Sequence, residues 1–214
     1  MNMRWKIGQV EMAGVTDLPF RLLCKEQGAG LLCTEMVSAK AISFHNKNTI
    51  SLMQIDPAEH PVSMQIFGSE PDLMAEVAKS IEEQPFDILD INMGCPVPKV
   101  VNNGEGSALL KNPELIREIV TKVSHAIKKP VTAKIRIGFE GYPVDPVEIA
   151  KIIEDSGAAA VAVHGRTRQQ YYSGEADWDT IRRIKEAVSI PVIGNGDVDS
   201  AKKAEALVKA TGCD

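Results

Sequence analysis

The sequence lacks any run of about 20 apolar residues, the length that a membrane-spanning helix needs. Its N-terminus leads into no apolar segment, so we also expect no secretion signal. None of the four cysteines forms a Cys-x-x-Cys pair or a spacing typical of metal ligands, which predicts free thiols, a cytoplasmic location and no metal site. A net charge of −5 excludes a uniformly basic surface, so any nucleic-acid binding has to be local.

Low-complexity tracts and linkers rich in Pro, Gly or Ser are also absent, and we therefore expect one domain over residues 1–214. What recurs is a short apolar run followed by an amphipathic helical pattern. The runs predicted as strands are Leu31–Thr34, Val62–Phe67, Ile88–Ile91, Val131–Ile135, Ala160–Val163 and Val192–Ile193. Helices are predicted at Asp17–Gln27, Glu70–Glu83, Glu114–Ile127, Pro146–Asp155, Trp178–Ala187 and Ala201–Lys209. This alternation indicates a parallel sheet, either closed into a barrel or open and doubly wound.

The positions of polar residues favour the barrel. Each of six polar residues lies at or just past the C-terminal half of a predicted strand, and in a (β/α)8 barrel of the TIM type these strand ends form one mouth. An open sheet would more often carry a Gly-x-Gly-x-x-Gly turn after its first strand, and the sequence has none. The six residues are Gln65, Asn92, Lys134, Arg136, His164 and Asn195.

The number of strands falls short of eight. Six are well defined, and a seventh over Lys6–Met12 is interrupted by Gln9 and Glu11. After the last predicted helix no further strand follows. Because a complete barrel typically has about 250 residues, the sequence predicts an incomplete one.

The stretch Asp90–Pro96 gives the clearest chemical signal. It starts at the end of an apolar strand and continues as Asn-Met-Gly-Cys-Pro, which predicts a tight loop that presents the Asn92 amide and the Cys95 thiol. In parallel sheets, ligands bind at such strand ends. A buried structural cysteine is the commoner fate of a lone Cys, so both interpretations of Cys95 stay open at this point.

Two further strand ends carry polar loops. The loop His164–Arg168 joins an imidazole to two guanidinium groups, which suits an anion such as phosphate. Solvated arginines and a strand-capping histidine explain the same pattern. The loop Gly194–Asp197 precedes a helix, and its backbone N–H groups either cradle a phosphate or form an ordinary strand-to-helix turn.

Three polar residues within strands also need an explanation. Lys134 and Arg136 alternate with apolar residues and therefore point to one face, where a lysine in a barrel lumen needs an electron-rich ligand. Gln65 needs hydrogen-bond partners, which either a ring ligand or a neighbouring strand end supplies.

Asp17 and Arg21 lie four residues apart at the start of a predicted helix. We interpret them as a helix cap and a helical ion pair.

Taken in order, these segments resemble the tRNA-dihydrouridine synthases, a family of flavin enzymes built on an α/β barrel. The resemblance extends over nearly the whole chain. Its most specific part is the combination of Asn-Met-Gly-Cys-Pro with His-Gly-Arg-Thr-Arg. The matching stretches are Met12–Asp17, Gln65–Gly68, Asp90–Pro96, Lys134–Arg136, His164–Arg168 and Gly194–Asp197.

The resemblance implies FMN across the barrel mouth, NADPH as its reductant and tRNA as the substrate. Reduced flavin would give a hydride to C6 of a uridine and Cys95 a proton to C5, which forms 5,6-dihydrouridine. Asn92 and Arg136 would hold the flipped-out uracil. The residues implied to bind FMN are Met12 and Ala13 beside the ring, Gln65 and Lys134 at its polar edge, and His164, Asn195, Gly196 and Asp197 around the ribityl chain and phosphate.

Two departures from the family pattern indicate a partial barrel. The family's first strand ends in Ala-Pro-Met-Ala-Gly after several apolar residues, whereas Val10 and Glu11 precede Met12 here. The eighth strand, its phosphate-binding Gly-Arg turn and the C-terminal helical domain are expected to be absent. Two alternatives stay open: an FMN barrel that acts on a free pyrimidine, like a dihydroorotate dehydrogenase, and an inactive remnant that is not an enzyme.

Overall fold

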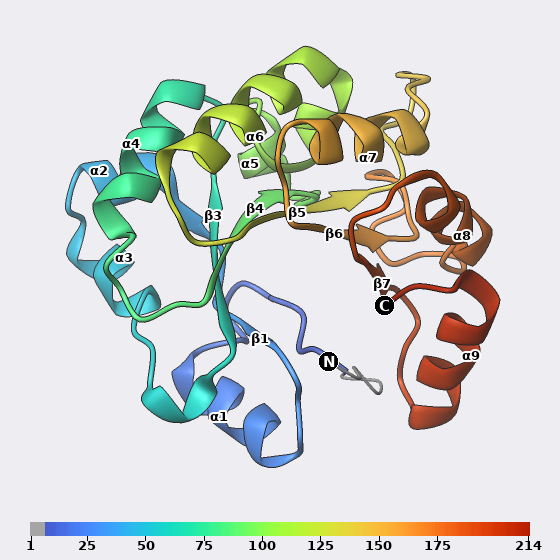
Figure 1. Cartoon of the computed structure of the whole chain (residues 1–214), viewed down its shortest axis with the longest axis horizontal. Helices are drawn as coiled ribbons and strands as arrows, with labels where there is room; N and C mark the ends of the chain where they lie inside the picture. The colour runs from blue at the N-terminus through green and yellow to red at the C-terminus, as the bar shows by residue number, and fades with distance from the viewer. Residues whose placement is uncertain (1–6) are drawn as a thin grey trace.

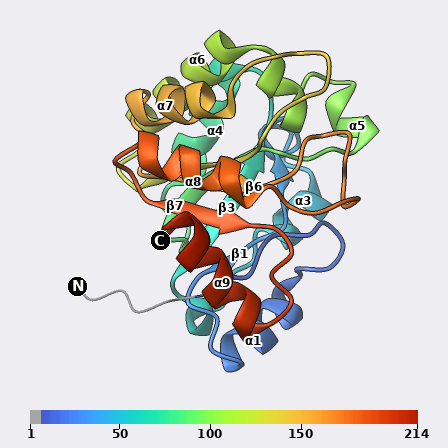
Figure 2. The same cartoon turned by 90° about the vertical axis from the view of Figure 1, so that its right-hand side faces the viewer.

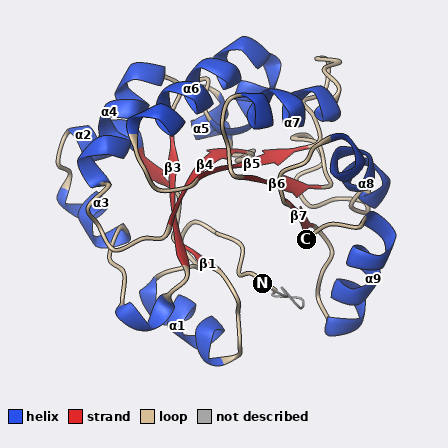
Figure 3. Cartoon of the chain, in the orientation of Figure 1, coloured by secondary structure: helices blue, strands red, loops and turns tan. Residues whose placement is uncertain are grey.

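The computed structural model describes residues 7–214, apart from the side chains at positions 47 and 48. Seven strands form one parallel sheet in the order β1-β3-β4-β5-β6-β7, and β2 also pairs with β3. The sheet curls, and the helices cover its outer side (Figure 1, Figure 3). The strands are β1 (Leu32–Cys33), β2 (Val37–Ser38), β3 (Val62–Phe67), β4 (Ile88–Met93), β5 (Val131–Arg136), β6 (Ala160–His164) and β7 (Val192–Asn195).

The helices follow the strands as the sequence predicts, with extra short ones in the loops. α2, α3 and α5 lie in stretches for which no helix was predicted. None of the helices within residues 7–214 is long and apolar enough to cross a membrane. The helices are α1 (Leu18–Glu26), α2 (Ala39–Ser43), α3 (Lys47–Leu52), α4 (Pro71–Ile81), α5 (Pro98–Val101), α6 (Pro113–Ala126), α7 (Pro146–Asp155), α8 (Trp178–Ala187) and α9 (Ala201–Thr211), with 3-10 turns η1 (Pro57–Glu59) and η2 (Gly106–Lys111).

The core lies between the sheet and the helices that cover it. Residues such as Ile66, Leu89 and Ile135 on the strands are fully buried, as are Ile116 and Ile119 on α6. β3 and β4 are buried on both faces over most of their length, whereas most of β5 alternates between buried and half-buried residues. The hydrophobic effect of this burial holds the strand ends in fixed positions relative to one another.

The predicted cap at α1 is confirmed, but the predicted ion pair is wrong. The Asp17 carboxylate accepts the backbone N–H of Phe20 at 3.0 Å. Arg21 turns inward instead, is 2% exposed, and its Nε lies 2.6 Å from Oε1 of the fully buried Glu59. A buried guanidinium needs a buried counter-charge, and the exposed Asp17 cannot provide one. Arg21 also donates to the carbonyl oxygens of Thr16 at 2.9 Å and Gln54 at 2.7 Å.

The barrel is partial, as predicted, and it is open between β7 and β1. Figure 2 looks onto the β7 edge, with α9 beside that strand. The strand predicted over Lys6–Met12 does not form: Lys6 lies outside the described residues, and Ile7–Met12 has no strand conformation. This segment nevertheless makes two backbone hydrogen bonds beside β1, from Gly30 N to Ile7 O and from Gln9 N to Leu31 O, both 2.9 Å.

Candidate active site

A cavity of ≈ 1020 Å³ lies at the carboxyl ends of the strands and continues into the open side between β7 and the N-terminal segment. Ligand sites typically have volumes of about 300–1,000 Å³, so this one is large enough for a cofactor together with part of a substrate. The cavity wall contains every predicted site residue except Gln65: Met12, Ala13, Asn92, Cys95, Lys134, Arg136, His164, Asn195, Gly196 and Asp197.

The register of the parallel strands brings these side chains together. Asn92 pairs with Lys134 across β4 and β5, Arg136 with His164 across β5 and β6, and His164 with Asn195 across β6 and β7. In a parallel sheet, paired residues lie side by side and face the same way. Polar residues far apart in the sequence thus form one continuous polar rim.

Beneath the rim, a buried hydrogen-bond chain runs from β5 to the cysteine loop. Thr132 Oγ1 donates to Asp90, whose Oδ2 accepts from Gln65 Nε2 at 2.7 Å. The Gln65 carbonyl accepts from Asn92 Nδ2 at 2.7 Å. Asp90 is 6% exposed, and this burial raises its pKa from 3.8 to about 6.

Gln65 therefore lies one layer behind the cavity, fully buried, with both ends of its amide engaged. Its direct contact with a ring ligand stays a prediction. Its position favours an indirect role, because it fixes the orientation of the Asn92 amide. When the Asp90 carboxylate is ionised, it can only accept hydrogen bonds. It therefore determines which group donates and which accepts in the hydrogen bonds that link Thr132, Asp90, Gln65 and Asn92.

The Asn92 side chain in turn organises the loop that carries Cys95. Its Oδ1 accepts the backbone N–H groups of Gly94 at 3.1 Å and Cys95 at 2.9 Å. The Cys95 carbonyl accepts from Ser107 Oγ at 2.9 Å. At Gly106, which has φ 58°, a Cβ would lie 2.9 Å from the Cys95 carbonyl oxygen, so a larger residue would displace this loop.

Cys95 is half-buried at the cavity wall, and burial raises the pKa of its thiol above the ordinary value of 9.0. The sulfur is thus protonated at neutral pH. Such a thiol is a poor nucleophile and a suitable proton donor. The structure therefore places a protonated thiol at the cavity surface, and its role as an acid stays a prediction.

Arg136 is 3% exposed and held by carbonyl groups on three sides. Its Nε donates to Gly94 O at 3.0 Å, and Nη1 donates to Thr167 O at 3.0 Å and to Tyr171 O at 2.9 Å. Nη2 makes no hydrogen bond to any residue that the structure describes. The hydrogen bonds of Nε and Nη1 therefore fix the orientation of the guanidinium group. Its Nη2 remains able to donate to an oxygen acceptor.

His164 is buried among positive charges. Burial, reinforced by Arg136, Lys134 and Arg166, lowers its pKa from 6.5 to about 3. The imidazole is therefore neutral, with one N–H donor and one acceptor, rather than an anion-binding cation. This differs from the simplest phosphate-binding interpretation of the His164–Arg168 loop.

Arg166 lines the cavity but is buried, and the protein itself binds most of its guanidinium group. Its Nη2 lies 2.6 Å from Asp197 Oδ1 and 2.7 Å from Gly174 O, and its Nε donates to Ser173 O at 3.1 Å. A further hydrogen bond joins Ala176 N to Asp197 Oδ2 at 2.6 Å. The hydrogen bond from Ala176 and the charge of Arg166 lower the pKa of Asp197 and keep it ionised. Arg166 thus fixes the loop after β7.

The loop after β7 has the donors that a ribityl phosphate requires. The Asn195 amide and the backbone N–H groups of Gly196 and Asp197 have no hydrogen-bond acceptor within the described part of the chain. Gly196 has φ 125°, and a Cβ there would lie 2.7 Å from the Ala176 Cβ, so the close turn requires glycine. Together with Lys134 on β5, which lines the same cavity, these groups suit a ligand that has both a polar ring and an anionic group.

Glu11 is the residue of this site that the sequence analysis missed, since it was interpreted only as an interruption of a strand. Its Oε1 lies 3.4 Å from Lys134 Nζ and 3.5 Å from Asn92 Nδ2. The signal for Glu11 in the sequence was an acidic residue between two apolar neighbours, Val10 and Met12. Tyr171 and Tyr172, which also line the cavity, carried no comparable signal.

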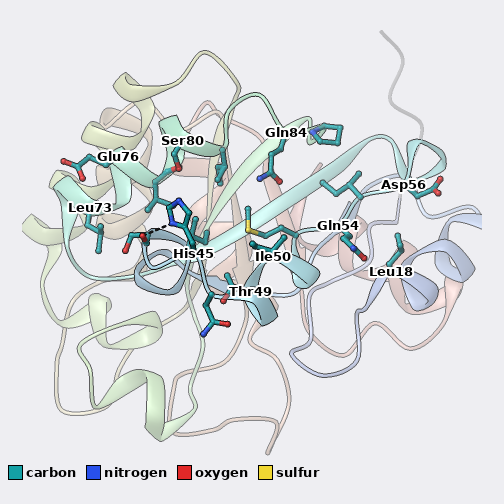
Figure 4. A pocket seen from close by; sticks show the side chains of 18 residues that line it. Leu18, His45, Thr49, Ile50, Gln54, Asp56, Leu73, Glu76, Ser80 and Gln84 are labelled. Atoms are coloured by element: carbon teal, nitrogen blue, oxygen red, sulfur yellow. Dashed lines mark hydrogen bonds between the residues drawn. The ribbon is translucent and has the colours of Figure 1, made fainter.

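A second cavity, of ≈ 790 Å³, lies between α3 and α4 (Figure 4). Its labelled side chains include His45, Thr49, Glu76, Ser80 and Gln84. It shares no lining residue with the barrel-mouth cavity and contains none of the predicted site residues. We assign it no part in the chemistry.

Two tRNA-dihydrouridine synthases match most of this chain. A tRNA-dihydrouridine synthase B from Pseudomonas syringae pv. tomato is 48% identical over 204 residues, which cover 95% of this chain and 60% of that protein. The enzyme of the same name from Xanthomonas axonopodis pv. citri is 45% identical over 209 residues, or 98% and 63% of the two chains. The chain thus spans about 60% of the length of the relatives it matches.

Comparison of structures supports the fold. A nitroalkane oxidase from Streptomyces ansochromogenes superposes with a TM-score of 0.54 at 17% identity, over 96% of this chain and 62% of that one. The sequence model described as "Dihydrouridine synthase (Dus)" matches residues 9–214. The chain therefore belongs to the dihydrouridine synthase family.

Proposed function

We propose that residues 7–214 form the cofactor- and uracil-binding part of a flavin enzyme that reduces uridine in tRNA to 5,6-dihydrouridine. The observation that carries the proposal is the protonated Cys95 thiol on the wall of a cavity lined by Asn92, Lys134 and Arg136. The curated relatives are named for this reaction. FMN, when bound and reduced by NADPH, supplies the hydride that C6 of the uracil accepts.

The residues of this chain have separate tasks in the proposal. The Lys134 ammonium would hold the polar edge of a bound flavin ring and would stabilise negative charge there. The Asn195 amide and the N–H groups of Gly196 and Asp197 bind the ribityl chain and phosphate, with the neutral His164 beside them. Met12 and Ala13, which line the cavity, would pack against the ring.

The proton for C5 comes from Cys95. Its raised pKa keeps the proton on sulfur until carbon accepts it, and the neighbouring Arg136 favours the resulting thiolate. Asn92 holds the loop in position, and the outward fork of Arg136 binds a carbonyl oxygen of the uracil. The uridine has to leave its base stack to enter the cavity.

The test is dihydrouridine formation in unmodified tRNA with FMN and NADPH, measured by mass spectrometry of the nucleosides. The chain should form dihydrouridine, and Cys95→Ala should bind FMN equally well but react at least about 100-fold more slowly, the usual contribution of a general acid. Equal rates for both proteins would refute the assignment of Cys95. Turnover of free dihydroorotate without any of tRNA would instead favour the free-pyrimidine alternative.

A further inference from the structure

We propose that the Glu11 carboxylate is an internal competitor for the ligand of Lys134, which a flavin has to displace before it can bind at the barrel mouth. This inference deepens the proposed function and rests on it. It concerns Glu11, which precedes Met12 where the family's Ala-Pro-Met-Ala-Gly pattern has proline.

The position of Glu11 carries the argument. Its side chain is only 9% exposed, and its Oε1 contacts both Lys134 Nζ, at 3.4 Å, and Asn92 Nδ2, at 3.5 Å. No other carboxylate within residues 7–214 forms an ion pair with Lys134. The carboxylate therefore lies against both groups that a ring with oxygen and nitrogen acceptors would use.

The chain on either side holds Glu11 in this place. The backbone of Gln9 bonds to Leu31, and the Gln9 side chain accepts the N–H of Cys33 at 3.1 Å. After Glu11, the N–H of Gly14 donates to the Glu35 carboxylate. The segment is thus fixed at two points, and the Glu11 carboxylate between them lies at the cavity wall together with Val10 and Met12.

The exposure of these side chains is the reverse of what burial of apolar surface would favour. Val10 and Met12 are 38% and 49% exposed at the cavity wall, while the Glu11 side chain between them is only 9% exposed. Burying a carboxylate is unfavourable unless it is paired. The ion pair with Lys134 stabilises the buried Glu11 carboxylate. The two side chains therefore stay paired as long as no other acceptor binds Lys134.

The consequence for binding follows from mass action. If the paired form dominates, the apparent dissociation constant of a ligand equals its intrinsic value divided by the fraction of chains in which Lys134 is free. Removing the charge of Glu11 raises that fraction. We expect Glu11→Gln to bind FMN about tenfold more tightly than the unmodified chain.

The experiment is a titration with FMN followed by quenching of flavin fluorescence. Glu11→Gln and Glu11→Ala are compared with the unmodified chain and with Glu26→Gln, which makes the same change of charge on the exposed side of α1. Both Glu11 variants should bind more tightly, and Glu26→Gln should not differ from the unmodified chain. Equal or weaker binding by the Glu11 variants overturns the inference and leaves the proposed function intact. Absence of binding by all four proteins overturns the proposed function and the inference with it.

A second measurement needs no flavin. Lys134 should be acetylated by acetic anhydride several-fold faster in Glu11→Gln than in the unmodified chain, as measured by mass spectrometry of peptides. Equal acetylation rates at Lys134 would show that the Glu11 carboxylate does not shield it, and would overturn the inference. Poorer folding of the variant would not account for equal rates, because it would expose Lys134 and raise its rate.

Discussion

The substitution Asp90→Asn tests the buried chain that orients the site. Burial raises the pKa of Asp90 from 3.8 to about 6, so the ionised carboxylate is less stable in the folded than in the unfolded protein. A difference of this size corresponds to about 3 kcal/mol. Asparagine has nearly the same shape and no charge, and it therefore removes the pH dependence but leaves the volume unchanged.

The sign follows from proton binding. Because the folded pKa is above the unfolded one, the folded chain binds more protons between these two values, and the contribution of Asp90 to stability is lost as pH rises through about 6. Below 3.8 the contribution is fully present. Between about pH 4.5 and about pH 7.5 the free energy of unfolding of the unmodified chain should thus fall by about 2 kcal/mol relative to that of Asp90→Asn.

Urea unfolding at the two pH values, followed by tryptophan fluorescence, measures this difference. Asp155→Asn, at an exposed position on α7, serves as the control and should show no comparable change. A difference between the unmodified chain and Asp90→Asn that is the same at both pH values would refute the reasoning. Asp90→Asn should also loosen the Cys95 loop, because an amide has only one acceptor oxygen and can no longer accept hydrogen bonds at both ends from Gln65 and Thr132.

Three further substitutions have definite expected outcomes. Arg21→Met leaves Glu59 buried without its partner and should lower the free energy of unfolding by about 3–5 kcal/mol; a loss under about 1 kcal/mol in urea unfolding would contradict a buried pair. Gly196→Ala places a Cβ 2.7 Å from that of Ala176 and should weaken FMN binding in the fluorescence titration, whereas unchanged affinity would mean that the loop adapts. In Arg136→Lys, a single ammonium group cannot reproduce the three directed hydrogen bonds of the guanidinium group. This variant should raise KM for tRNA more than it lowers kcat. Unchanged steady-state kinetics would exclude contact between Arg136 and the uracil.

The sequence was most informative where structure is local or periodic. The bounds of β3, α7 and α8 were predicted to the residue, since each combines a clear apolar period with a definite start. Five of the six polar residues predicted at strand ends line one cavity, because parallel pairing brings them to one side of the sheet, whereas Gln65 lies buried behind it. The partial barrel followed from the number of strands.

What the sequence did not show depends on contacts between distant residues. Arg21 was assigned to Asp17, four residues away, but pairs with Glu59, 38 residues away, because only that carboxylate is buried. The helices α2 and α3 were missed because they are short and lie in a loop that packs against α4. Glu11 was missed because its partner, Lys134, lies on a strand more than 100 residues later.

The central claim is that the barrel mouth is a flavin site built around Lys134. The most direct measurement is the visible spectrum of Glu11→Gln titrated with FMN, beside that of the double variant Glu11→Gln, Lys134→Met. The account predicts a saturable shift of the flavin absorption band with one FMN per chain, and much weaker binding after loss of the lysine. Binding of equal strength in both proteins would contradict the role of Lys134, and no spectral change in either would contradict the flavin site itself.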